Sequence, residues 1–167
     1  SPDPFASIAR LAERLPENIL VGAGTVLTAD DVDRLHDAGG TLMVSPNVDP
    51  VVIGRAVSYG MATMPGALTP TEYFQALRSG ASAVKIFPAG RMGPDYLPDI
   101  QAVLPKGTRL LPVGGVDTRN MAAFMEKGAA GFGFGSTLYR PGKSVAEITA
   151  SARALVAEYR RIVDTKV

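Results

Sequence analysis

The strongest constraint on the fold is a repeat of short apolar runs that alternate with amphipathic stretches. The six runs start roughly 20 residues apart, the spacing of a strand–helix repeat. They are Ile19–Val26, Leu42–Pro46, Met61–Ala67, Ala83–Pro88, Leu110–Gly115 and Gly131–Ser136. Their near-continuous apolarity is typical of parallel strands that helices cover on both faces. The repeat therefore predicts an α/β fold.

Two of the intervening stretches place apolar residues at helical spacing. The first set is Phe5, Ile8, Leu11, Ala12 and Leu15; the second is Ile148, Ala152, Leu155, Tyr159 and Ile162. We expect each set to form the buried face of a helix.

Helix ends are marked by polar and glycine residues. Thr69-Pro70-Thr71-Glu72 has the pattern of a capping box with proline at the first helical position. Thr28, with Asp31 three residues later, predicts a second helix start, and Asp117 a third. Glycines that predict helix ends precede four of the runs, at Gly39, Gly60, Gly80 and Gly128.

A βα period this short favours a (β/α)8 TIM barrel over a doubly wound, nucleotide-binding sheet. The G-x-G-x-x-G motif that would favour the doubly wound sheet is absent from the first strand-to-helix turn. A closed barrel of this kind needs eight βα units, whereas the sequence predicts six. We therefore expect residues 1–167 to form a single barrel domain that lacks its first two units. About 40 residues before Ser1, or another chain, would supply them.

Composition narrows the chemistry. The chain has no cysteine and one histidine, His36, which leaves almost nothing for a metal site or a histidine-based triad. The net charge of +1 provides no field for nucleic acid or an anionic membrane. No apolar run approaches the ~18–20 residues of a membrane span. We expect a cytoplasmic enzyme that acts on a small molecule.

Lys85 is the strongest catalytic candidate. In the run Ala83–Pro88, alternation places Val84 and Ile86 against helices and Lys85 on the inner face of the barrel. An ammonium in apolar surroundings tends to lose its proton, and a neutral amine can attack a ketone. The alternative is a lysine that extends its charged end into solvent or pairs with a carboxylate.

Two glycine segments have the pattern of a phosphate site. Gly114 and Gly115 end the fifth run, and Gly135 and Ser136 end the sixth. If two units precede the chain, these are barrel strands seven and eight, whose loops commonly bind phosphate. The alternative is glycine that serves only tight turns between strands and helices.

Other polar residues have weaker signals. The hydroxyl of Thr25 would lie on the inner face of the first strand, and Pro65 would shape the pocket wall. The capping box explains Glu72 without chemistry, and His36 is expected on a helix surface. Arg91 and Arg140 follow predicted strands. In that position each side chain either binds an anionic ligand or extends into solvent.

These residues lie in motifs that resemble the 2-keto-3-deoxy-6-phosphogluconate/galactonate (KDPG/KDPGal) aldolase family. The motifs, in the family's order, are GAGTVLT (22–28), SPN (45–47), PG and TPTE (65–72), VKIFPA (84–89), VGGV (113–116) and GFGSTLYRPG (133–142). The resemblance implies a carbon–carbon lyase that splits a 2-keto-3-deoxy-6-phospho sugar acid into pyruvate and glyceraldehyde 3-phosphate, with no metal or cofactor. It also suggests a homotrimer.

The resemblance assigns roles by position. Lys85 matches the Schiff-base lysine, Thr25 a residue near the pyruvyl carboxylate, and Pro65 a pocket residue. The phosphate cradle matches Gly114, Gly115, Gly135 and Ser136. At Val113 the gluconate branch has threonine, so valine favours the galactonate branch.

The sequence departs from the family in one respect. The family's acid/base glutamate and its carboxylate-binding arginine would both lie before Ser1, so we expect this segment alone to be inactive or to fold poorly. Two alternatives remain open. One is another phosphate-binding barrel isomerase or synthase in which Lys85 is a base or a charge clamp, and the other is a non-catalytic split-barrel fragment that needs a partner.

Overall fold

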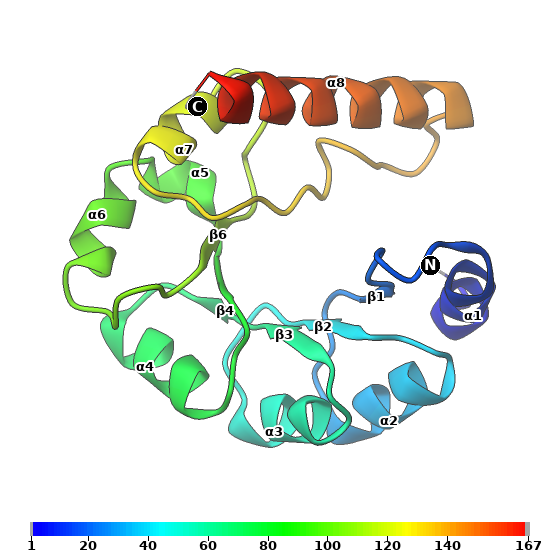
Figure 1. Cartoon of the computed structure of the whole chain (residues 1–167). Helices are drawn as coiled ribbons and strands as arrows, with labels where there is room; N and C mark the ends of the chain where they lie inside the picture. Colours follow the sequence, from blue (N-terminus) through cyan, green and yellow to red (C-terminus); the bar gives the residue numbers. More distant parts are fainter. Residues whose placement is uncertain (1, 166–167) are drawn as a thin grey trace. The chain divides into compact units, whose positions relative to one another are not determined.

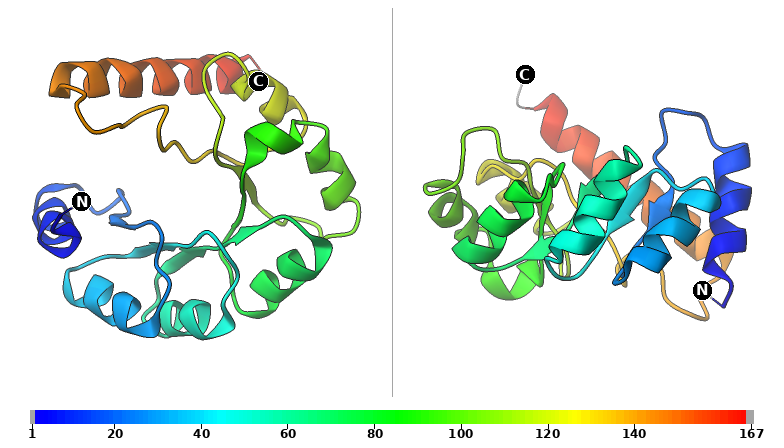
Figure 2. Two further views of the ribbon diagram at one scale, coloured as in Figure 1. Left: turned by 180° about the vertical axis from the view of Figure 1, so that it is seen from behind. Right: turned by 90° about the horizontal axis from the view of Figure 1, so that it is seen from below.

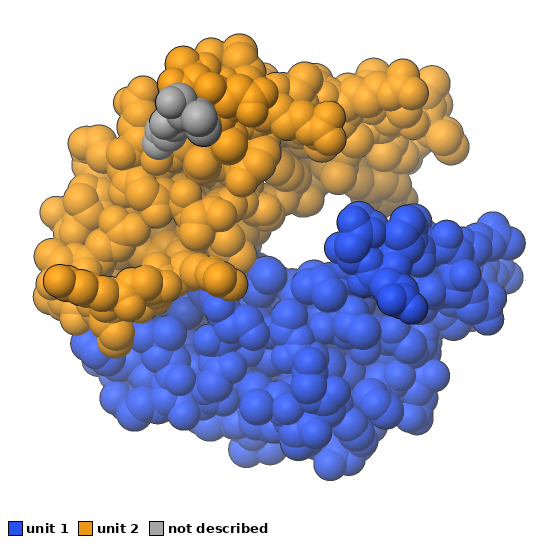
Figure 3. All heavy atoms as spheres, viewed as in Figure 1, with its two compact units in different colours: residues 1–85 blue, residues 86–167 orange. Residues whose placement is uncertain are grey.

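The computed structural model describes residues 2–165 and divides the chain into two compact units, residues 1–85 and 86–167 (Figure 3). Helices and short strands alternate along both units, so the predicted α/β class is confirmed. The boundary between the units falls within one strand, β5 (Val84–Ile86).

Unit 1 contains a three-stranded parallel sheet. Its strands lie in the order β1 (Gly22–Ala23), β2 (Leu42–Val44) and β3 (Ala62–Met64). Gly22 pairs with Leu42, and Leu42 pairs with Ala62. The remaining elements are α1 (Pro4–Arg14), α2 (Ala29–Asp37), α3 (Pro50–Ser58), β4 (Gly66–Ala67) and α4 (Pro70–Arg78).

Figure 1 shows α2 and α3 side by side on one side of β2 and β3. Their inward residues form the core of unit 1: Val32 and Leu35 from α2, and Ile53 from α3, are fully buried and pack in one cluster with Met43 of β2. Apolar burial of this kind is the main favourable term in folding.

Unit 2 contains α5 (Ala89–Met92), α6 (Tyr96–Gln101), β6 (Leu110–Pro112), α7 (Met121–Glu126) and α8 (Val145–Asp164). Figure 2 shows α7 beside the C-terminal half of the long helix α8. Buried Met121 of α7 packs with Leu155 and Ile162 of α8.

Most predicted helix ends are confirmed. Thr69 and Glu72 form a complete capping box at the start of α4, and the hydroxyl of Thr28 accepts from the amide of Asp31 at the start of α2. The four predicted stop glycines all have a left-handed backbone, which favours glycine: Gly39, Gly60, Gly80 and Gly128. Asp117 was wrong as a helix start. Its carboxylate instead accepts from the amide of Arg119, which closes a turn, and α7 begins only at Met121.

Two of the six apolar runs differ from the predicted strands. Met61–Ala67 is divided into β3 and β4 at Pro65, which has no amide to donate to a ladder. Gly131–Ser136 forms no strand, and only Gly133 makes an isolated parallel bridge, to Val113. Three glycines in six residues weaken a strand, because glycine loses more conformational entropy and packs no side chain.

The two predicted helix faces are only partly buried. Ile8 of α1 is buried, as are Leu155 and Ile162 of α8, but Leu11 is 48% and Leu15 41% exposed. Within unit 1, α1 packs against α2 and β1, which cover part of its apolar face. Among residues 2–165, no helix combines the length and the apolar content that crossing a bilayer requires.

Candidate active site

Lys85 lies in the middle of β5 with a pattern of burial that alternates along the strand. Val84 and Ile86 are fully buried, whereas Lys85 is only partly buried. In unit 1, the amide of Lys85 donates to the carbonyl of Pro65 at 2.9 Å. Since successive side chains of a strand point to opposite faces, the lysine lies on the face opposite to Val84 and Ile86, as predicted.

Burial lowers the pKa of the Lys85 ammonium from its ordinary value of 10.5, and desolvation is the cause. Removing a cation from water disfavours the charged form, so the neutral amine is more populated here than on an exposed lysine. This is the direction that nucleophilic attack on a ketone requires.

The structure brings the two predicted glycine segments of unit 2 together around one cavity. The cavity measures about 130 Å³ and is lined by Phe87, Val113, Gly114, Gly115, Val116, Gly133, Gly135, Ser136 and Thr137. The parallel bridge between Val113 and Gly133 aligns the segments. We call Val113–Val116 and Gly133–Thr137 the cradle segments.

Backbone geometry explains the glycines of the first cradle segment. Gly114 and Gly115 both have left-handed backbones, with φ of 84° and 77°. The amide of Gly90, in α5, donates to the carbonyl of Gly114 at 2.7 Å, and the amide of Ala89 donates to Val113 at 2.9 Å. The start of α5 is thereby attached directly to the backbone of this segment.

Side chains that the sequence interpretation missed hold the cradle segments in place. The amide group of Asn120 donates to the carbonyl of Gly115 at 2.8 Å, and its oxygen accepts from the amide of Asp117 at 3.0 Å. The hydroxyl of Thr137 donates to the carbonyl of Val116 at 3.0 Å and so joins one segment to the other. The spacing of Asp117 and Asn120 was the only signal of this arrangement in the sequence.

Thr25 differs from its predicted environment. β1 ends at Ala23, so Thr25 lies beyond the strand, exposed, with a left-handed φ of 60°. This conformation is an outlier for a β-branched residue and is typical of functional sites. Thr25 lines a hollow of about 360 Å³ in unit 1, together with Phe5 and Arg34. Pro65, the other predicted pocket residue of unit 1, is buried.

Glu72 and His36, the remaining polar candidates, make contacts that explain them without a role in the site. The Glu72 carboxylate accepts from the amides of Leu68 and Thr69, and these bonds lower its pKa despite partial burial. His36 is exposed on α2, as predicted, and stacks on Tyr59 with ring centroids 3.9 Å apart. Among residues 2–165, no three His, Cys, Asp or Glu side chains are grouped as a metal site would require.

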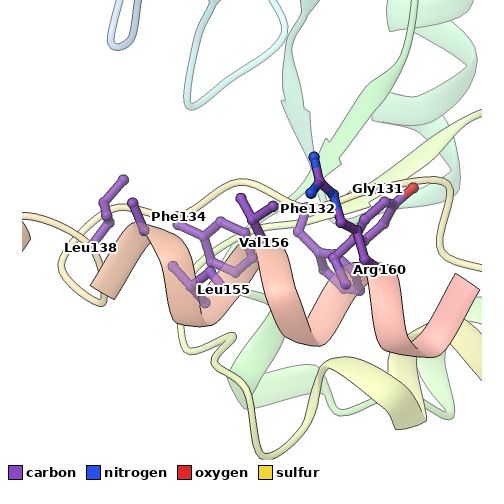
Figure 4. A pocket seen from close by; sticks show the side chains of 9 residues that line it. Gly131, Phe132, Phe134, Leu138, Leu155, Val156 and Arg160 are labelled. Atoms are coloured by element: carbon purple, nitrogen blue, oxygen red, sulfur yellow. The ribbon is translucent and has the colours of Figure 1, made fainter. Parts of the chain in front are cut away.

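A second, larger cavity of unit 2 lies along α8. Figure 4 shows Phe132, Phe134, Leu155 and Val156 around it, with the guanidinium of Arg160 at one side. This groove of about 400 Å³ is almost entirely apolar and contains none of the predicted site residues.

Comparison with known proteins decides the family. The sequence profile described as "KDPG and KHG aldolase" matches residues 3–152. The chain belongs to this aldolase family. It is 49% identical, over 95% of its length and 75% of the relative's, to the probable 2-dehydro-3-deoxy-6-phosphogalactonate aldolase of Rhizobium meliloti (strain 1021).

Two further similarities place the chain within the aldolase family. It is 45% identical to the 2-dehydro-3-deoxy-6-phosphogalactonate aldolase of Escherichia coli (strain K12), over 98% of this chain and 80% of that protein. A solved structure described as native KDPGal superposes with a TM-score of 0.95 at 44% identity, and the match covers 98% of this chain and 80% of the other. The family resemblance inferred from the motifs is therefore confirmed.

Proposed function

We propose that this aldolase cleaves 2-dehydro-3-deoxy-6-phosphogalactonate to pyruvate and glyceraldehyde 3-phosphate through a Schiff base on Lys85. The observation that carries the proposal is a partly buried lysine with a lowered pKa at the position that the family motif VKIFPA predicts. The names of the two aldolase relatives support the substrate.

The reaction begins when the neutral amine of Lys85 adds to the C2 ketone and water is lost, which forms an iminium. A general base then removes the proton of the C4 hydroxyl, and the resemblance gives this role to a glutamate outside this sequence. The electron pair of the breaking C3–C4 bond moves into the iminium. This releases the aldehyde and leaves an enamine. Protonation at C3 and addition of water release pyruvate and restore the lysine.

The cradle segments bind the phosphate in this proposal. Gly114, Gly115 and Gly135 line the cavity without side chains of their own and provide backbone amides, and Ser136 adds a hydroxyl. Binding energy from a group remote from the reacting bond holds the reacting carbons in position and so contributes to rate. In unit 1, we assign Thr25 to the pyruvyl carboxylate and Pro65 to the pocket wall.

Val113 carries the preference for the galactonate epimer in our proposal. Its side chain lines the cradle cavity next to Gly114, where a hydroxyl-bearing residue would change the contacts available to the sugar acid. We expect Val113→Thr to shift the ratio of kcat/KM values towards the gluconate epimer. An unchanged ratio would remove Val113 from this role.

We further propose that this chain contributes its βα units to a (β/α)8 barrel, in a cytoplasmic homotrimer. The near-complete superposition on the native KDPGal structure supports the barrel. Sedimentation measures the oligomer.

Borohydride trapping tests the proposed chemistry. Reduction in the presence of pyruvate should attach the three-carbon unit to a single lysine, which peptide mass spectrometry should identify as Lys85. Lys85→Met should give no adduct, and Lys106→Met, at an exposed position, should still give it. A folded wild-type protein without an adduct would favour an isomerase or synthase instead.

A further inference from the structure

The second cradle segment continues into a single turn whose two ends have different surroundings. The amides of Leu138 and Tyr139 both donate to the carbonyl of Gly135, at 3.0 and 2.9 Å, and close the turn. At its beginning, Gly135, Ser136 and Thr137 line the cradle cavity. A contact that fixes the end of this turn, near Leu138, therefore also restricts the residues at its beginning that line the cavity.

Lys143 holds that far end. Its partly buried ammonium donates to two successive carbonyls, those of Thr137 at 3.4 Å and Leu138 at 3.2 Å. A third donor reaches the hydroxyl of Ser151 on α8 at 3.4 Å. The carbonyl one residue earlier, that of Ser136, accepts from Nε of Arg140 at 3.0 Å.

An ammonium suits this position because it has three donors and no acceptor, so one group can bind two carbonyls and an anchor at once. Its bonds are charge-assisted and stronger than those between neutral groups. Glu147, the nearby carboxylate on α8, is already engaged by the hydroxyl and amide of Ser144 in a capping box. The contacts of Lys143 thus connect the turn to the first half of α8.

We propose that Lys143 is a positioning residue for phosphate recognition. It fixes the Gly135–Tyr139 turn against α8, so that Gly135 and Ser136 keep their positions in the lining of the cradle cavity. This inference rests on the proposed function, because it assumes that the cavity binds the phosphate of the substrate. Lys143 acts through the main-chain carbonyls of Thr137 and Leu138, and its effect is limited to the phosphorylated end of the substrate.

The test compares two acceptors in the direction of synthesis, using the full-length protein and pyruvate. Glyceraldehyde 3-phosphate uses the cradle, and unphosphorylated glyceraldehyde does not. Lys143→Met should raise KM for the phosphorylated acceptor about tenfold, the expected scale for losing charge-assisted bonds that hold a binding segment. It should change kcat/KM for the unphosphorylated acceptor by no more than about twofold, which is within ordinary context variation. Lys143→Arg, which keeps a charged donor, should restore most of the discrimination.

Ser151→Ala removes the α8 contact of Lys143 and leaves both carbonyl contacts, so it should shift the acceptor ratio in the same direction as Lys143→Met but by a smaller factor. Thr149→Ala is the matched control, because its hydroxyl bonds within α8 to the carbonyl of Val145, and it should leave the acceptor ratio unchanged. An equal loss with both acceptors in Lys143→Met, or an unchanged ratio, would overturn the positioning role. If the wild-type protein forms no pyruvate adduct on Lys85, the proposed function fails instead, and the two failures remain distinct.

Discussion

Gly90 and Gly115 meet backbone to backbone. A methyl group on Gly90 would lie 2.9 Å from the Cα of Gly115, and a methyl group on Gly115 would lie 3.0 Å from the Cα of Gly90. Real Cβ atoms essentially never come closer than 3.0 Å to such atoms, and a contact at 3.0 Å is already tighter than most. The start of α5 and the first cradle segment are therefore packed at a separation that only two glycines allow.

Gly90→Ala should force these segments apart. We expect the free energy of unfolding to fall by about 1–3 kcal/mol, as for other overpacked sites, and KM for the phosphorylated substrate to rise. The matched control is Gly54→Ala, in the exposed middle of α3, where an added Cβ meets no atom within 4 Å. There the same change should stabilise by about 0.5–1 kcal/mol, because alanine favours the helix. Urea denaturation measures both, and equal effects would contradict this packing argument.

Lys85→Met should abolish turnover and also stabilise the fold. Activity should fall by on the order of 10³ or more, because the covalent step is lost. The pKa of Lys85 is lowered in the folded state, so the buried ammonium destabilises the protein at neutral pH. This destabilisation decreases as pH rises from the lowered pKa of the folded state towards 10.5. In that interval the folded protein loses the proton while the unfolded chain still binds it. Methionine has no such penalty.

The measurement is the free energy of unfolding of both proteins between pH 7 and pH 10. The stability advantage of Lys85→Met should be largest at pH 7 and should shrink as pH rises. The kcat/KM of the wild type should increase over the same range as the neutral amine forms. A stability difference that grows with pH would show that the pKa of Lys85 is not lowered in the folded state.

The α4 capping box should give a pH dependence of the same sign but in the acid range. The backbone bond from Leu68, with further bonds from Thr69, lowers the pKa of Glu72 below its ordinary value of 4.5. Its contribution to stability is complete above 4.5 and is lost as pH falls through the lowered pKa. Glu72→Gln should therefore cost about 0.5–1 kcal/mol at pH 7, and less as pH falls towards 3. Thr69→Ala in a double-mutant cycle should reveal the coupling between the two halves of the box.

Thr25→Asn should separate stability from function. Asparagine tolerates the left-handed backbone that Thr25 adopts at φ 60°, so the variant should be more stable by up to about 1 kcal/mol. Activity should fall, because the hydroxyl assigned to the pyruvyl carboxylate is gone. Thr118→Asn, at an exposed turn position, should change neither quantity. Loss of stability in Thr25→Asn would show that the threonine side chain has a structural partner.

Local signals predicted the local structure well. The Thr69–Glu72 box and the helix-ending glycines depend on atoms a few residues apart, so their sequence patterns specify the geometry directly. Alternation along Ala83–Pro88 predicted the environment of Lys85 for the same reason. Gly131–Ser136 forms no strand because the weakening effect of its three glycines outweighs its apolar content.

Contacts between distant segments were not predictable. The bond from Thr137 to Val116 joins residues 21 positions apart, and Lys143 reaches across a turn to α8. Nothing in the residue types at these positions specifies their partners, since threonine and lysine are common in loops. The left-handed backbone of Thr25 was also missed, because its propensity favours a strand.

Four of the nine residues that line the cavity in unit 2 are glycines, which can contribute only main-chain atoms. Phosphate binding by main-chain amides is retained when most neighbouring residues are replaced, since the backbone amide is the same in nearly every residue. Neighbouring side chains such as Val113 are thereby free to diverge, and a lineage can acquire a new sugar acid without first rebuilding its hold on the phosphate. A library that randomises the non-glycine residues of the lining and keeps the glycines would therefore vary specificity for the sugar acid while phosphate binding is retained.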